Sequence, residues 1–113
     1  NEKAFMEEAY FNEIRGQFCA KNAAIKAGKM MSSEAIIYEN KVFAFFSRKQ
    51  KMVFKLGKTF DPDAQDLEIV VFNPFKKRAP LHGWFELDFL NKEHWERFAE
   101  QALEVIKKEI HNS

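Results

Sequence analysis

The stretch that decides the fold is KMMSSEAIIYENKVFAFFSRKQKMVFKL, residues 29–56. β-Branched and aromatic residues recur in it in short runs, and polar residues separate the runs. This pattern is typical of β-strands joined by tight turns. We predict strands over residues 35–38, 41–47 and 51–56, with turns at Glu39-Asn40 and at residues 48–50. The stretch therefore predicts an antiparallel meander.

One amphipathic segment precedes the meander, and two further strands follow it. Residues 2–21 place apolar side chains at near-helical spacing between charges, which predicts a helix from Glu2 to about Lys21, and we expect the segment to end at Ala27-Gly28. The apolar pattern of residues 68–72 and 83–89 predicts two more strands. Asp61 is placed to cap a short helical turn ahead of them.

The last segment carries the strongest helical pattern. Apolar residues form a stripe through residues 91–110. We expect Asn91 to cap this helix, and Leu90 and Trp95 to form a hydrophobic staple across its first turn. The order of elements predicts an α+β two-layer sandwich, an antiparallel sheet of about five strands with two long terminal helices on one face. The residues predicted to be buried are Phe54, Phe85, Leu87, Phe98, Ala102 and Ile106.

Size and composition place the chain among single globular domains. It has 113 residues, 46% of them hydrophobic, and thirteen are Phe. We expect one domain over residues 1–113, with an aromatic core. No apolar run approaches the roughly 20 residues of a membrane span. Cys19 is the single cysteine, which favours a reducing, cytoplasmic location. Because the chain starts at Asn1 and not at Met, we expect residues to precede it in the encoded protein.

Several segments between about residues 26 and 107 carry a resemblance to a known family: residues 29–33, 36–44, 55–56, 72–74 and 83–87 and the closing helix. Together they resemble the N-terminal domain of the TfoX competence regulators, with the YjbR-like proteins sharing the general plan. The resemblance implies a bacterial protein with a two-layer α+β fold similar to secretion chaperones, and it implies no catalytic residues. TfoX proteins have a second, C-terminal domain, and the function of that domain is not transferred here.

No constellation in the sequence predicts catalysis, a cofactor or a metal. His82, His94 and His111 are not spaced three or four residues apart, so they form no helical metal clip. A nucleophilic pair of Cys19 with a histidine has no motif around it. Glu86 and Asp88 lie two apart on one predicted strand, where paired acids can act in acid–base work or bind a cation. We interpret them as a solvated strand face.

Basic residues gather around the meander although the net charge is only +1. Residues 41–60 contain six Lys or Arg residues and no acid. The candidate basic partner surface comprises Arg48, Lys49, Lys51, Lys76, Lys77 and Arg78. With Phe75 and Trp84 as stacking surfaces, this set supports an alternative function, a nucleic-acid-binding accessory protein.

The second predicted strand is apolar on both faces. Strict alternation places Val42, Ala44 and Phe46 on one face and Phe43 and Phe45 on the other, and the pattern leaves open which face meets the helices. The remaining aromatics need a cover, and we expect a homodimer or another protein partner to supply it. The candidate apolar interface is Phe43, Phe45 and Trp84. The sequence therefore favours a non-enzymatic protein-interaction module with a regulatory role.

Overall fold

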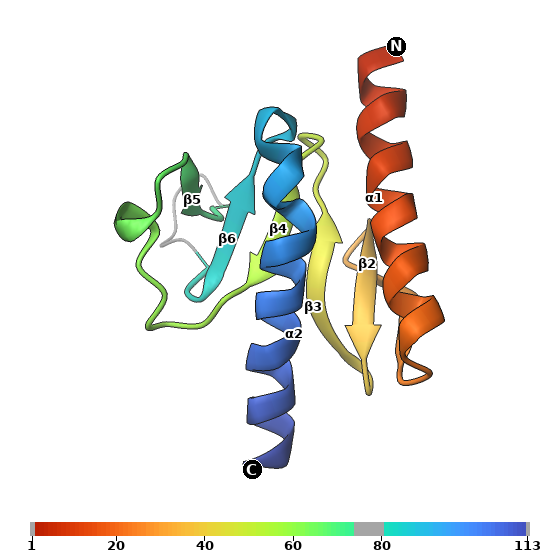
Figure 1. Ribbon diagram of the computed structural model, residues 1–113, viewed down its shortest axis with the longest axis vertical. Helices are drawn as coiled ribbons and strands as arrows, with labels where there is room; N and C mark the ends of the chain where they lie inside the picture. Colours follow the sequence, from red (N-terminus) through yellow and green to blue (C-terminus); the bar gives the residue numbers. More distant parts are fainter. Residues whose placement is uncertain (1, 74–80, 113) are drawn as a thin grey trace.

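Two long helices and six strands make up the described chain, together with two short 3₁₀ helices. The structure is a computed structural model that describes residues 2–73 and 81–112. In chain order its elements are α1 (Glu2–Lys21), β1 (Ile25–Met30), β2 (Ser33–Tyr38), β3 (Lys41–Phe46), β4 (Met52–Lys55), η1 (Pro62–Ala64), β5 (Ile69–Val71), β6 (Trp84–Leu87), η2 (Phe89–His94) and α2 (Trp95–His111) (Figure 1). The six strands form one sheet in the order β1-β2-β3-β4-β6-β5, and each neighbouring pair is antiparallel.

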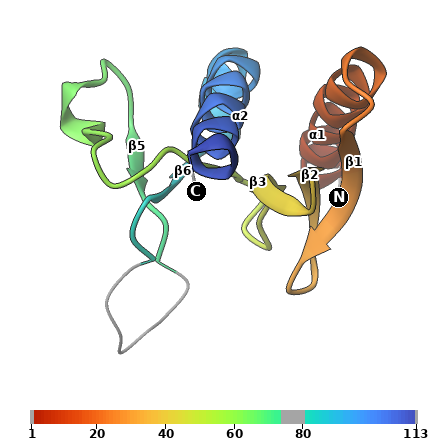
Figure 2. The same ribbon diagram turned by 90° about the horizontal axis from the view of Figure 1, so that it is seen from below.

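Both long helices cover the same face of the sheet. Figure 2 shows α1 and α2 on one side of the strands, while the turns that join β1 to β2 and β3 to β4 project to the other side. The predicted α+β two-layer sandwich is confirmed, with six strands in place of about five. We call the sheet face away from the helices the open face.

The main core lies between the helices and the sheet, and its aromatic character follows from the sequence. All six residues predicted to be buried are buried. The rings of Phe54 on β4 and Phe98 on α2 lie with centroids 5.8 Å apart. Phe46 on β3 stacks on Phe11 of α1 and meets Trp95 of α2, so one ring joins all three elements. Large aromatic area removed from water therefore holds the two layers together.

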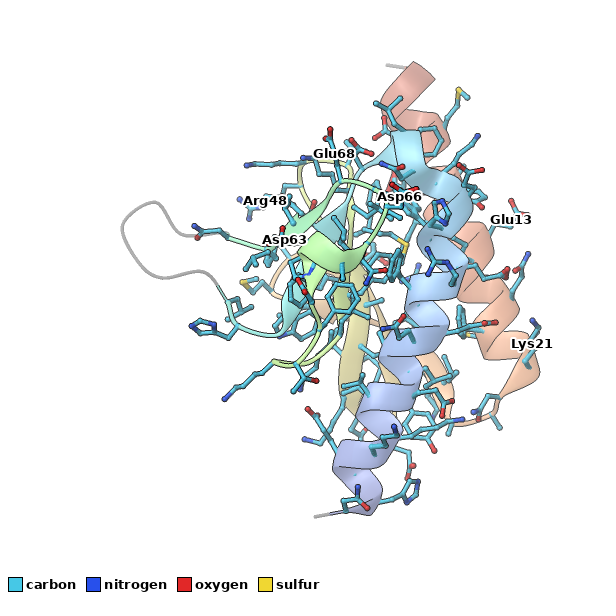
Figure 3. The ribbon with its side chains drawn as sticks, turned by 60° about the vertical axis from the view of Figure 1, so that its left-hand side comes forward. Glu13, Lys21, Arg48, Asp63, Asp66 and Glu68 are labelled. Atoms are coloured by element: carbon cyan, nitrogen blue, oxygen red, sulfur yellow. The ribbon has the colours of Figure 1, made fainter. Side chains whose placement is uncertain are left out.

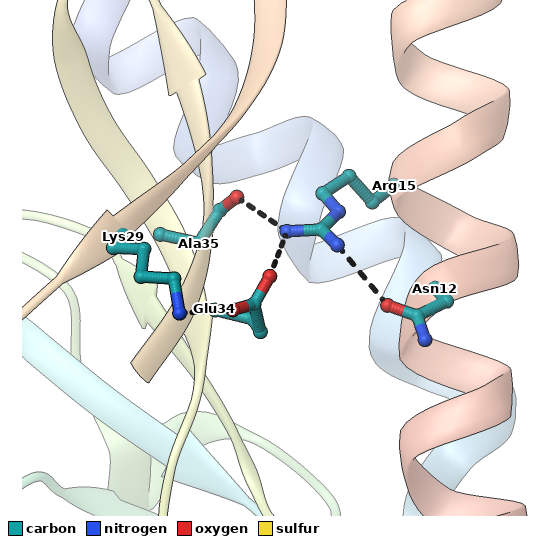
Figure 4. Close-up of polar contacts among 5 residues, drawn as sticks. All are labelled: Asn12, Arg15, Lys29, Glu34 and Ala35. Carbon is teal, nitrogen blue, oxygen red and sulfur yellow. Dashed lines mark hydrogen bonds and ion pairs between the residues drawn. The ribbon is translucent and has the colours of Figure 1, made fainter. Parts of the chain in front are cut away.

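Arg15 fastens α1 to β2 of the sheet (Figure 4). Its Nη1 donates to the carbonyl oxygen of Ala35 at 3.2 Å and to Glu34 Oε1 at 3.1 Å, and its Nη2 donates to Asn12 Oδ1. Lys29 of β1 lies 2.9 Å from the other carboxylate oxygen of Glu34. The hydrogen bonds from Lys29 and then from Arg15 hold the pKa of Glu34 below its ordinary value.

Two local predictions about turns are confirmed. Glu39 and Asn40 have φ values of 45° and 71°, the positive values that a two-residue type I′ hairpin turn requires. The Asp61 side chain accepts a hydrogen bond from the backbone N–H of Asp63 at 3.0 Å and so caps η1. Each turn is decided by residues next to one another in the chain.

The predicted helix over residues 2–21 is confirmed, but the expectation that its segment ends at Ala27-Gly28 was wrong. α1 ends at Lys21, and residues 25–30 form the edge strand β1. Lys26, Gly28 and Lys29 have low strand preference, which hid this strand from sequence analysis. It is held by pairing with β2, from Ile25 opposite Tyr38 to Met30 opposite Ser33.

The predicted alternation of β3 was wrong at Phe43. The β2–β3 register places Ile36 opposite Ala44 and Ile37 opposite Val42, which leaves Phe43 as the extra residue of a β-bulge. Phe43 therefore joins Ala44 and Phe46 in the main core. The open face receives Val42 and Phe45 instead.

The predicted start of the second helix was also wrong. Asn91 lies inside η2 with non-helical dihedrals, and its Nδ2 donates to Asp88 Oδ1 at 3.0 Å. α2 begins at Trp95, whose indole N–H donates to the carbonyl oxygen of Asp88. Leu90 is 86% exposed, so it makes no staple with Trp95. The need of a buried indole N–H for an acceptor explains why the chain turns here before the helix begins.

Candidate partner-binding surface

The open face carries an apolar cluster of its own. Its buried members are Ala35 of β2, Phe45 of β3, Val53 of β4 and Phe72, the residue after β5. Phe45 lies at the centre of the rings, with centroids 5.3 Å from Phe72 and 5.6 Å from Trp84. Trp84, on β6, is only partly buried. The cluster forms because β6 pairs with β4 and so brings Trp84 beside the central strands.

A pocket of about 590 Å³ opens beside this cluster. Phe45 and Phe72 line it as apolar residues, and Met31 and Ser32 of the β1–β2 turn form one rim. Ser47, Arg48 and Lys49, directly after β3 and in the turn that follows it, also line the pocket, and Glu86 lines it from β6. Small-ligand pockets span about 300–1,000 Å³, so this space accommodates a side chain or small group of a partner.

The cations at this rim are unequally compensated. Arg48 Nη2 donates to Ser32 Oγ at 2.9 Å, which links the two hairpin turns. Lys51 Nζ lies 4.0 Å from Glu86 Oε1 and balances that carboxylate. Within residues 2–73 and 81–112, neither Arg48 nor Lys49 has a carboxylate oxygen within 4.0 Å. The rim therefore carries two positive charges beside an apolar floor.

Two of the six residues of the predicted basic surface line this pocket. Arg48 and Lys49 are exposed in the β3–β4 turn, and Lys51 follows them directly before β4. Figure 3 shows Arg48 on the opposite side of the sheet from α2. Lys76, Lys77 and Arg78 lie outside the described residues.

The three residues of the predicted apolar interface have different environments. Phe43 is fully buried in the main core, where its ring meets Phe18 of α1 at 5.9 Å. Phe45 is 1% exposed, because Phe72 and Trp84 pack against it. Trp84 is the member of the set that solvent reaches. The bulge at Phe43 is the physical reason that the set divides between the two sheet faces.

Met31 is a rim residue that sequence analysis missed. It is 73% exposed, and its φ of 58° lies in the left-handed region that a non-glycine residue seldom adopts. The signal in the sequence was the Met-Met pair directly before Ser-Ser, because it places an apolar residue at the turn of a hairpin. Phe72 was also missed as a site residue, since only the packing of β5 and β6 places it beside Phe45.

The remaining candidate residues have separate surroundings. Cys19 packs against the main core on α1. Glu86 lies near Lys51, whereas the carboxylate of Asp88 accepts from Asn91, so the two acids do not act on one site. His94 Nδ1 lies 3.1 Å from Arg97 Nη2. His82 and His111 are exposed. Across the described ranges, no group of three or more His, Cys, Asp or Glu residues is placed to hold a metal ion.

None of the helices in the described chain is long and apolar enough to cross a membrane. Comparison of the chain with family models, with curated proteins and with solved structures found no match. The surface is therefore interpreted from its own geometry.

Proposed function

We propose that this chain is a non-enzymatic binding module whose open face receives a partner protein. The observation that carries the proposal is the pocket of about 590 Å³, with Phe45 and Phe72 at its floor and an exposed methionine at its rim. Apolar surface beside polar residues marks interaction sites more often than it occurs by chance. Methionine suits such a rim, because its unbranched side chain adapts to different partners.

A binding role without catalysis is consistent with the structural contacts that the reactive side chains make. Glu86 lies against Lys51, Asp88 holds Asn91 and Trp95 at the start of the last helix, and Cys19 packs in the core. Each of these groups has a structural partner. A regulatory role and a cytoplasmic location belong to the proposal, the location resting on the single cysteine. The resemblance to the TfoX N-terminal domain stays a prediction on which the proposal does not depend.

Nucleic-acid binding is the second candidate, and the grouping of Arg48, Lys49 and Lys51 near one turn favours it. Single strands bind by stacking bases on accessible aromatic faces. Phe45 and Phe72 are buried by each other and by Trp84, which leaves Trp84 as the accessible ring of this cluster. The open face thus suits an apolar side chain better than a row of stacked bases.

Matched substitutions of two exposed apolar residues test the proposal. Met31→Asn removes the apolar rim and keeps a residue that tolerates positive φ. Leu90→Asn makes the same chemical change in η2, on a side chain 86% exposed. In affinity capture from native cells with quantitative mass spectrometry, we expect one partner to be kept by the parent and by Leu90→Asn and reduced with Met31→Asn. Equal recovery with all three proteins would contradict the proposal.

A further inference from the structure

The pocket on the open face combines an apolar floor with a positively charged rim. Phe45 and Phe72 provide the floor, and Arg48 and Lys49 line the mouth. Met31 also lines the pocket, and its side chain is largely exposed. A chemical group that matches this surface must bring an apolar part and a negative charge close together.

The charges of the pocket residues determine the sign of the charge that a bound group should carry. Glu86 contributes the single carboxylate among the described lining residues, and Lys51 lies 4.0 Å from it. Arg48 is engaged with a hydroxyl, Ser32 Oγ, which leaves its positive charge uncompensated by any described carboxylate within 4.0 Å. Lys49 is exposed and likewise has no carboxylate at that distance in the described ranges. The excess charge at the mouth is therefore positive.

The size and the lining of the pocket favour an extended peptide segment. Residues of both hairpin turns line the pocket, and the Arg48–Ser32 hydrogen bond joins the two turns, so a segment can lie across the mouth while one side chain enters the pocket. Recognition of extended segments commonly divides in this way, with pockets for individual side chains giving specificity. Acidic groups beside the anchoring side chain would then meet Arg48 and Lys49 at the rim.

A second copy of this chain fits the pocket less well. A two-fold dimer places the same patch of both copies in one interface. The uncompensated cations of the two rims would then share that interface, and like charges oppose association. A different partner with acidic residues removes this conflict.

We propose that the open-face pocket, lined by the β1–β2 and β3–β4 turns and by Phe72, recognises a short acidic segment of a partner protein, anchored by one large apolar side chain. The apolar side chain rests on Phe45 and Phe72, and flanking carboxylates pair with Arg48 and Lys49. This inference rests on the proposed function and specifies the chemistry of the partner.

Selection from a phage-displayed library of random linear peptides tests the inference with a defined probe. We expect the enriched peptides to combine acidic residues with a large aliphatic or aromatic one. The peptides are then synthesised with a fluorescent label and titrated by anisotropy against the full chain. The variant Arg48→Gln/Lys49→Gln should bind them about tenfold more weakly, because two exposed ion pairs with the peptide are lost. Added salt should reduce the same affinity.

A matched control separates rim charge from net charge. Lys41→Gln also removes a positive charge from β3, but at the opposite end of that strand from the Arg48 turn, and Lys41 is exposed. It should leave the affinity unchanged. Met31→Asn should weaken binding without changing its salt dependence, since Met31 contributes apolar contact. Circular dichroism confirms that each variant is folded.

The outcomes distinguish the inference from the proposed function. Two results would contradict an acidic partner: enriched peptides that are apolar and contain no acidic residues, or peptides that bind Arg48→Gln/Lys49→Gln as tightly as the parent. Neither result would contradict the proposal that the open face binds a protein. Failure to enrich any peptide also overturns recognition of a short segment. In both cases the proposed function falls only if the capture experiment with Met31→Asn and Leu90→Asn fails as well.

Discussion

The side chain of Ile37 on β2 occupies the space above Gly28 on β1. Gly28 pairs with Ala35 in the sheet, and Ile37 lies two residues further along the same face of β2. A Cβ on Gly28 would overlap Cδ1 of Ile37 and would lie 2.8 Å from its Cγ1. Moving the terminal methyl group of Ile37 alone does not remove the overlap, because Cγ1 is also too close. The χ1 angle of Ile37 must change as well, and χ1 of a β-branched residue is stiff. Gly28 is thus required by close packing across the edge pair of the sheet.

Gly28→Ala should lower the free energy of unfolding by roughly 1–3 kcal/mol, the usual cost of overpacking. Urea denaturation measures it. In the background of Ile37→Ala the same substitution should cost nothing or stabilise the protein, because the overlapping atoms are gone. Gly16→Ala is the control on exposed helix: nothing lies within 4 Å of its added Cβ, and we expect a gain of about 0.5–1 kcal/mol. A cost for Gly28→Ala that persists in Ile37→Ala would contradict the packing explanation.

Phe98→Ala should lower the free energy of unfolding by roughly 3–5 kcal/mol. Phe98 is fully buried and meets Phe54 and Phe60. Leu90→Ala should change stability by less than about 0.5 kcal/mol, because an exposed side chain loses little packing. Urea denaturation measures both changes. The result for Leu90→Ala tests whether Leu90 is exposed, as in the structure, or packs on Trp95 as a hydrophobic staple. A large loss with Leu90→Ala would mean that Leu90 packs in solution.

Glu34 should make stability depend on acid pH. Its folded pKa is lowered by Lys29 and then by Arg15, so its contribution is complete above the unfolded value of about 4.3 and is lost as pH falls through the lower folded pKa. The side chain is 35% exposed, so solvent screening limits each pair to about 0.2–1 kcal/mol.

The stability difference between the parent and Glu34→Gln should therefore be larger at about pH 7 than at about pH 2. Urea denaturation at both pH values measures this difference, and Glu8→Gln, an exposed position on α1, controls for the loss of one charge. Titration of the Glu34 carboxyl carbon by NMR gives the folded pKa directly. A value at or above that of an unfolded glutamate would contradict the assignment.

The sequence favours a homodimer or another protein partner, whereas the charged rim of the open face favours a monomer, and sedimentation distinguishes the two. On the second basis we expect a monomer at tens of micromolar, because a two-fold contact at the open face brings the rim cations of both copies together. A dimer that persists at high salt would instead show an apolar contact strong enough to overcome that charge. That result would contradict the proposal that the pocket binds an acidic segment of a different protein.

Nucleic-acid binding should be weak, in the non-specific range of about 10⁻⁴–10⁻⁶ M at physiological salt. Lys49→Glu should lower any such affinity equally for all sequences, and Lys41→Glu at the far end of β3 is the matched control. Fluorescence titration with single- and double-stranded DNA and with RNA measures both. A sequence-selective complex of submicromolar affinity would favour the second candidate function over protein binding.

The candidate site could be predicted from the sequence only in part. The run of basic residues around Arg48 and the surplus of aromatics in β3 are visible locally, and they identified Arg48, Lys49, Phe45 and Trp84. The pocket depends on residues that meet through pairing across long stretches of chain. β6 must pair with β4 to bring Trp84 beside Phe45, and Phe72 arrives with them.

The sequence by itself determined the kinds of element, because hydrophobic period and turn chemistry are local. It placed α1, the hairpin turn at Glu39-Asn40, the cap at Asp61 and the buried stripe of α2. Only the tertiary structure decided where β1 lies and which residues of β3 face the helices. The bulge at Phe43 arises from the register between β2 and β3, and one extra residue moves a side chain from one sheet face to the other.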